Sequence, residues 1–316
     1  MLTALTRRVV ALLLTLLAVS ALVFVVMDAL PGDPAAIMLG TSASPDTLVA
    51  LRHELGLDRP LLLRYFMWLA SAARGDFGTS YVYGVPVSEL LAERLAITIP
   101  LTAIAVFLSV AIAVPLGAFS AARRNSAFDH VVGVVSQLFI AVPGFWVALL
   151  LILLFSVRLR IMPSGSFPGW ESSLWAALKS LVLPAVALAL PQAGVLTRVT
   201  RSAVLEVLNE DYVRTARAKG LPQRVALWRH AVPNAMVPVV TILGLQFTFL
   251  VAGAILVENL FNLPGLGRLA YQSLMQRDVV VLQDVVLFFA GLVVVVNFLV
   301  DLSYLFFDPR LREATT

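Results

Sequence analysis

Long uncharged apolar stretches alternate with short polar segments along this chain. A bilayer core of about 30 Å needs roughly 20 apolar residues in a helix that rises about 1.5 Å per residue. An isolated strand cannot satisfy its backbone in hydrocarbon, so each stretch is predicted to be a helix. The pattern predicts an all-α membrane protein with six transmembrane helices, at Val9–Met27, Leu95–Ala122, Val131–Val157, Ser180–Thr197, Ala231–Val257 and Val285–Phe307.

Composition excludes a soluble globular domain. The chain is 60% hydrophobic and 13% charged, whereas soluble domains average about 45–50% apolar and about 25% charged residues. It has no cysteine, which excludes disulfides and thiol chemistry, and its three histidines, at 53, 130 and 230, lack metal-ligand spacing. We therefore expect no metal site and no cofactor within this chain.

The distribution of basic residues predicts the orientation. With the N-terminus inside, 13 of the 23 Lys and Arg residues fall in the short inner segments, as the positive-inside rule requires. Both termini are therefore expected in the cytoplasm. A signal peptide with Arg7 and Arg8 as its charged region is an alternative, but its apolar core would be longer than the usual 7–15 residues. An uncleaved first helix is favoured.

The polar segments predict three parts: residues 1–30 with the first helix, an extracytoplasmic segment at 31–94, and a core at 95–316 with five helices. Helical spacing at Leu48–Leu57 and Leu61–Ala73 predicts short helices in the external segment. That segment is too short for a separate enzyme domain. Residues 158–179 and 258–284 are expected to form two more external loops.

A basic segment at 198–234 is expected on the cytoplasmic side. Its first helix should end at Gly220-Leu-Pro222, since glycine can adopt a left-handed cap and proline cannot continue the helix. A second helix, Gln223 to His230, would lead into the fifth span at Pro233. Two helices joined by a hinge form a shape that could bind in a groove of another protein. On composition alone, a loop that binds anionic lipid headgroups is equally compatible.

Several motifs resemble one family along nearly the whole chain. Arg214-Thr-Ala216-x-x-x-Gly220, with Pro233 thirteen residues later, is similar to the E-A-A-x-x-x-G loop of binding-protein-dependent ABC importer permeases, and Asp211 to Gly220 resembles the peptide and nickel branch. Arg214 and Thr215 replace the Glu and first Ala of the motif, and Val279-Val280 and Asp284 also depart from the family pattern. The other matching motifs are Pro31-Gly-Asp-Pro34, Gly75-Asp-Phe-Gly-Thr-Ser80, Leu263-Pro-Gly-Leu-Gly-Arg-Leu269 and Asp301-Leu-x-Tyr…Asp308-Pro-Arg310.

The resemblance implies a type I importer permease of the bacterial inner membrane. It implies a heterodimer with a second, similar permease, two cytoplasmic ATPase subunits that hold ATP and Mg, an extracytoplasmic substrate-binding protein, surrounding lipid and no nucleic acid. The basic segment would be the coupling helix that meets the ATPases. Its candidate residues are Asp211, Tyr212, Arg214, Thr215, Ala216, Arg217, Ala218, Lys219, Gly220, Arg224 and Pro233.

The chain carries no motif for ATP hydrolysis of its own. The G-x-x-x-x-G-K-S/T loop is absent from the sequence, and Gly265-Leu-Gly267 has no accompanying lysine. H-E-x-x-H and a nucleophile elbow are absent as well. We therefore expect a transport subunit and no enzyme.

Few ionisable residues lie in the predicted spans, and those few are candidates for the translocation path. Asp28 lies at the outer mouth, and Asp301 follows Asn297 by one turn near the inner surface, where Arg310 or Arg312 could pair with it. So few fixed charges favour a permissive path that passes substrates with varied side chains, and the family resemblance implies short peptides as those substrates. Nickel chelates or glutathione-like solutes are alternatives. A proton-coupled carrier would show inverted repeats, which we do not find, and a scaffold without transport would leave the basic segment unused.

Overall fold

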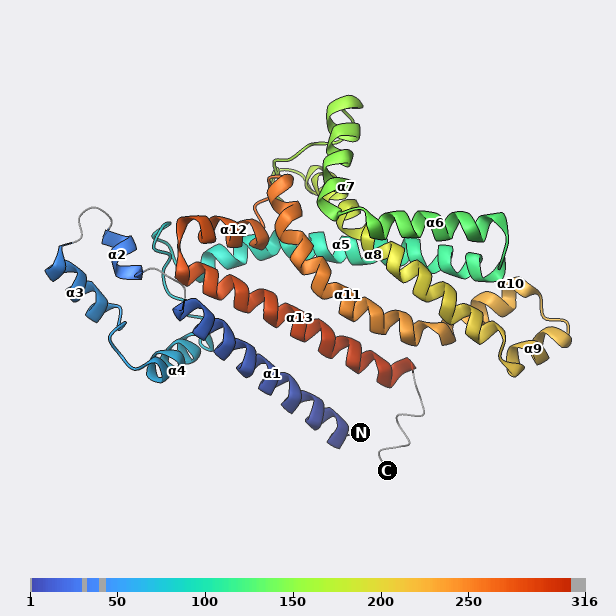
Figure 1. Ribbon diagram of the computed structural model, residues 1–316, viewed down its shortest axis with the longest axis horizontal. Helices are drawn as coiled ribbons and strands as arrows, with labels where there is room; N and C mark the ends of the chain where they lie inside the picture. The colour runs from blue at the N-terminus through green and yellow to red at the C-terminus, as the bar shows by residue number, and fades with distance from the viewer. Residues whose placement is uncertain (1, 30–32, 40–43, 308–316) are drawn as a thin grey trace. The chain divides into compact units, whose positions relative to one another are not determined.

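A computed structural model of the chain describes residues 2–29, 33–39 and 44–307. The secondary-structure elements of these residues are all helices (Figure 1). Pro31, Gly32, Asp308, Arg310 and Arg312 of the sequence predictions lie outside these residues. The helices are α1 (Leu2–Asp28), α2 (Pro34–Leu39), α3 (Pro45–Glu54), α4 (Leu61–Ala72), α5 (Val87–Ala122), α6 (Ala127–Ala141), α7 (Gly144–Leu151), η2 (Ile152–Arg158), α8 (Leu174–Leu208), α9 (Asp211–Ala218), α10 (Gln223–Val225), η3 (Ala226–Ala231), α11 (Val232–Leu260), α12 (Leu266–Gln276) and α13 (Val279–Phe307), of which η2 and η3 are π-helical.

Five helical segments of the described chain are long and apolar enough to cross a membrane. They are Thr6–Asp28, Val87–Ala122, Leu174–Leu208, Gln223–Leu260 and Val279–Ser303. The all-α membrane class is therefore confirmed, and each of these five contains or overlaps a predicted span. Four of these helical segments are longer than the predicted spans by more than a turn because they continue past charged residues at one or both ends.

The remaining predicted span, Val131–Val157, is not one straight helix. Ala127–Ala141 and Gly144–Arg158 meet at a bend of 100°, and together they supply the sixth span if they are counted as one. The cause is Pro143, which has no N–H to donate and forces the residue before it out of the helical region. Val142 accordingly has extended backbone angles, φ −82° and ψ 124°.

The chain divides into two compact units. The first comprises residues 1–6, 99–263 and 295–316. Within it α8 packs against α6, α7 and α11, and most of its inward side chains are small. Gly194 is required there, because a Cβ atom would lie 2.7 Å from the carbonyl oxygen of Ser136 on α6. Close helix contacts through small residues are typical of membrane bundles.

The second unit comprises residues 7–98 and 264–294. It contains the predicted short external helices, observed as α3 and α4, and also α12, which lies within the predicted external loop at 258–284. Asp278 ties this unit together: its carboxylate accepts a hydrogen bond from Ser80 and one from the backbone N–H of Val281 at the start of α13. The tripartite division expected from the sequence stays a prediction.

Candidate functional site

The basic segment forms two helical pieces around a glycine. Residues 211–218 form α9, and Gly220 follows with φ +94°, a value that L side chains rarely adopt. The backbone N–H of Leu221 bonds to the carbonyl of Ala216, which closes the end of the helix. Pro222 then starts the helix that runs through η3 into α11 without a break. The predicted helix, hinge and helix are therefore present.

One side chain anchors α9 to the rest of its unit. Val213 is completely buried, and it is the one buried residue of this helix. Sequence reasoning did not single it out, although a lone apolar residue in a charged helix was a usable signal. The other side chains of α9 are exposed or half-buried, so most of its surface is open to another molecule.

The segment after the hinge is packed much more firmly. Leu227 and Ala231 of η3 join a buried cluster with residues of α5 and α8, and Trp228 contacts Phe119 edge to face at 5.6 Å between ring centroids. The Gln223 side chain also donates to the carbonyl oxygen of Ala122, at the end of α5. Displacement of the second helical piece therefore strains the ends of the long helices around it.

The predicted coupling residues lie mostly on the exposed surface. Asp211 and Arg214 lie 3.8 Å apart as a weak, exposed pair, and partial burial beside the Glu210 carboxylate raises the pKa of the Tyr212 hydroxyl above its usual value. Pro233 is exposed in the first turn of α11, and Ala216 is half-buried. The remaining predicted residues are all exposed: Thr215, Arg217, Ala218, Lys219, Gly220 and Arg224.

A buried ion pair between α6 and α8, near the end of α5, was not foreseen. Asp129 accepts two hydrogen bonds from Arg201, at 2.6 and 2.7 Å, and one each from Ser120 and the backbone N–H of Asn125. The expectation that Asp28 and Asp301 are the ionisable residues within spans is therefore wrong. The third helical stretch begins at Ala127 and so includes Asp129, and α8 extends past Arg201.

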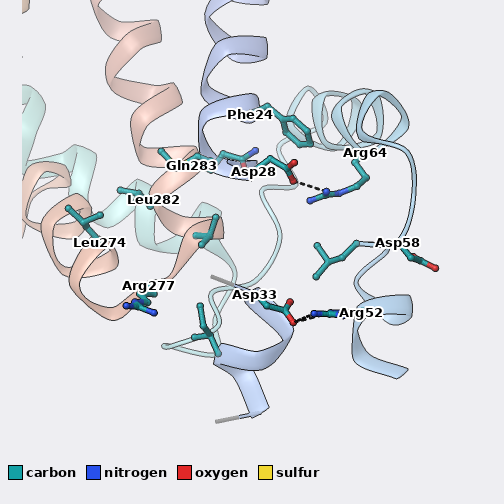
Figure 2. Close-up of a pocket in the computed structure, with 14 residues that line it drawn as sticks. Phe24, Asp28, Asp33, Arg52, Asp58, Arg64, Leu274, Arg277, Leu282 and Gln283 are labelled. Carbon is teal, nitrogen blue, oxygen red and sulfur yellow. Dashed lines mark hydrogen bonds and ion pairs between the residues drawn. The ribbon is translucent and has the colours of Figure 1, made fainter. Parts of the chain in front are cut away.

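Asp28 lies at the rim of a pocket of about 650 Å³ in the second unit (Figure 2). It pairs with Arg64 of α4 at 2.7 Å, and Asp33 pairs with Arg52 at 2.8 Å. Arg277 and Gln283 also line this pocket, and Gln283 lies beside Asp28 in this view. The Asp28 carboxylate is thus already engaged by a guanidinium, so a substrate ammonium group would have to compete with Arg64.

The other two predicted path residues lie near the end of α13. Asn297 is half-buried, and its side-chain oxygen would lie 3.3 Å from a Cβ atom placed on Gly244 of α11. Asp301, four residues later on the same helix face, is exposed. Asn297 therefore lies where two helices approach closely, which is a packing position.

Comparison with known proteins assigns the chain to a family. Residues 113–313 match the family described as "Binding-protein-dependent transport system inner membrane component", and residues 1–102 match the N-terminal family of the same systems. The crystal structure of an amino acid ABC transporter with histidines aligns with 68% of this chain and 92% of its own, at 19% identity and a TM-score of 0.47.

Three relatives match over almost their whole length. A Brucella abortus (strain 2308) protein named for a peptide transport system permease is 42% identical over 97% of this chain and 98% of its own. The oligopeptide transport system permease protein AppB of Bacillus subtilis (strain 168) is 39% identical over 97% and 98%. The glutathione transport system permease protein GsiC of Salmonella choleraesuis (strain SC-B67) is 39% identical over 97% of each chain. The chain, a helical multi-pass protein of the inner membrane, belongs to the family of binding-protein-dependent transport system inner membrane components.

Proposed function

We propose that this chain is the permease subunit of an ATP-driven importer for short peptides. Relatives named for peptide and oligopeptide transport, which match nearly end to end, support the substrate class. ATP and Mg would be held by separate ATPase subunits, and an extracytoplasmic binding protein would deliver the substrate to a heterodimer of this chain and a second permease.

The exposed surface of α9 is the observation on which the coupling proposal depends. The segment 211–224 carries four basic residues (Arg214, Arg217, Lys219 and Arg224) against one acidic residue, Asp211. An acidic or polar groove on an ATPase subunit would complement this charge. Arg224 stands at the start of the helix that continues through η3 into α11. A force applied to α9 would thus pass to a membrane-crossing helix.

The docking must be strong for this arrangement to work. Shifting a two-state equilibrium from 1:99 to 99:1 takes about 5.5 kcal/mol of differential binding. A single exposed ion pair contributes about 0–1 kcal/mol, so several contacts must act together. The cluster of exposed charged and polar side chains on α9 can provide that number.

Charge reversal at Arg217 and Lys219 tests the proposal. The transporter is reconstituted in proteoliposomes with its partner subunits, and peptide uptake and ATPase activity are measured together. We expect R217E/K219E to lose most uptake while insertion and heterodimer assembly persist. The matched control is R158E/R160E, the same charge change at two exposed arginines of the predicted external loop. Full uptake by R217E/K219E, or equal loss in both variants, would contradict the coupling role.

Glutathione-like peptides are a second candidate substrate class, favoured by the relative named for glutathione transport. Nickel chelates remain an alternative from the branch resemblance. Uptake of a labelled dipeptide is measured in the presence of glutathione, longer peptides or chelated nickel. The competitor that inhibits uptake most strongly identifies which of these candidate substrate classes the transporter prefers. Uptake driven by a proton gradient in vesicles without any ATPase subunit would instead establish a secondary carrier and overturn the importer proposal.

A further inference from the structure

Helix α4 has an uncovered apolar face. Leu62 is 71% exposed and Phe66 is 59% exposed, and Leu63 and Met67 beside them are also exposed. The one charged residue of this helix, Arg64, turns away to pair with Asp28 at 2.7 Å. A helix in water places polar residues on its outer face. By contrast, α3 in the same external segment has no buried residue and carries Asp46, Arg52, His53 and Glu54.

The position of α4 along α1 gives its depth in the membrane. Between Arg8 and Asp28, α1 has nineteen residues without charge (9–27), which at about 1.5 Å each span roughly 28 Å, the thickness of a bilayer core. Asp28 therefore marks the outer boundary of the hydrocarbon. Contacts made by α4 below Asp28 on α1 lie inside that core.

Tyr65 of α4 makes such contacts. Its hydroxyl lies 2.9 Å from the Ser20 hydroxyl and 3.3 Å from the Leu17 carbonyl oxygen. Ser20 and Leu17 precede Asp28 by eight and eleven residues, so they lie roughly 12 and 16 Å further in along the helix. Phe24, four residues before Asp28 and so roughly 6 Å further in, contacts the rings of both Tyr65 and Trp68. The inner side of α4 thus reaches well into the outer half of the core.

The polar groups of α4 fit such a position. Inside hydrocarbon each polar group needs a protein partner. The Tyr65 hydroxyl has its partners on α1, the Trp68 indole N–H donates to Asp284 of α13, and the Arg64 guanidinium reaches back to the boundary at Asp28, as Figure 2 shows. Long cationic side chains behave in this way near membrane surfaces.

We propose that α4 is an amphipathic helix inserted in the outer leaflet, where Leu62, Leu63 and Phe66 contact lipid acyl chains, while the sulfur of Met67 accepts a hydrogen bond from Arg59 at 3.1 Å. Twelve residues span only about 18 Å, too short to cross the bilayer. Lipid is the occupant because α4 lies against residues of a membrane-crossing helix that are inside the hydrocarbon core by the depth argument above, namely Leu17, Ser20 and Phe24 of α1.

Single-cysteine spin labelling tests this inference, and the chain has no native cysteine to remove. Leu62→Cys and Phe66→Cys are labelled in the full-length chain within the assembled transporter, reconstituted in phosphatidylcholine–phosphatidylglycerol liposomes. Collision rates are measured with oxygen, which concentrates in lipid, and with a water-soluble nickel complex. Val49→Cys on α3 is the aqueous control, since Val49 is 65% exposed, and Leu22→Cys on α1, at 63%, is the lipid reference.

We expect the oxygen-to-nickel collision ratio at 62 and 66 to match that at 22 and to exceed that at 49 severalfold. A ratio like that at 49 would place α4 in water and overturn the proposal. Low collision with both reagents would mean that another protein covers the face, which overturns it equally. Peptide uptake is not read out, so the outcome is independent of the proposed function.

Discussion

At the scale of single residues, the Asp129–Arg201 pair joins the start of α6 to α8. Asp129 is 6% exposed and is held by two guanidinium bonds, a serine hydroxyl and a backbone N–H. Removing one partner of a buried pair leaves the other charge desolvated without compensation. This pair therefore stabilises the packing of α5, α6 and α8 only as long as both members are present.

Asp129→Ala should destabilise the protein by on the order of 3 kcal/mol, because the Arg201 charge then lacks its carboxylate. The measurement is the thermal midpoint of the purified complex in detergent, followed by size-exclusion fluorescence. Arg198→Ala serves as control: Arg198 lies one turn away on α8, is exposed, and bonds to Gln137. Its midpoint should hardly change. Equal losses in the two variants would show that the buried pair has no special role.

The sequence could not reveal this pair, because its members lie 72 residues apart and both were assigned to loops or span ends. Motif resemblance identified the exposed residues of α9, since their types and spacing are local. It missed Val213, whose importance depends on what packs against it. Local chemistry was thus predictable, and contacts across the fold were not.

At the scale of elements, Gly220 separates a loosely attached helix from a firmly packed one. Gly220→Val should cost about 1–3 kcal/mol of local backbone strain at φ +94°, because no neighbouring atom lies within 4 Å and the clash is with the backbone alone. The strain would reorient α9. We expect uptake to fall severalfold while ATPase activity persists in reconstituted vesicles.

Gly169→Val is the matched control for the hinge. Gly169 has φ +87°, and a Cβ atom placed on it would also have no neighbour within 4 Å, but it lies in the predicted external loop. Its substitution carries a similar backbone cost without touching α9. If both variants lost uptake to the same degree, general destabilisation would explain the result and the hinge would have no coupling role.

Element existence was predicted better than element boundaries. The apolar stretches identified six spans because hydrophobic length is a strong signal. Prolines 100, 115, 184, 191 and 238 lie inside continuous helices, yet Pro143 produces the 100° bend. Sequence alone does not tell which proline breaks a membrane helix, since neighbouring groups decide it. The sequence did carry a signal for α12, because the spacing of Leu266, Leu269, Ala270 and Ser273 places them on one buried face of a helix.

At the scale of the whole molecule, the orientation in the membrane is the central prediction. An impermeant maleimide should label Val49→Cys from the outside of intact spheroplasts and Arg217→Cys only after permeabilisation, because the basic segment stays inside. Both positions are exposed, so reactivity differs only through access. External labelling at 217 would invert the topology and remove the coupling helix from its expected partner.

The attachment of α9 through Val213 has a consequence for how such transporters diversify. A short helix with one fully buried side chain can change its exposed side chains without disturbing the packing of the core. Recognition of a different ATPase subunit could thus arise by substitutions within the eight residues of α9. Grafting the outward positions of a sister permease onto this chain should exchange motor preference and leave the substrate range as it was.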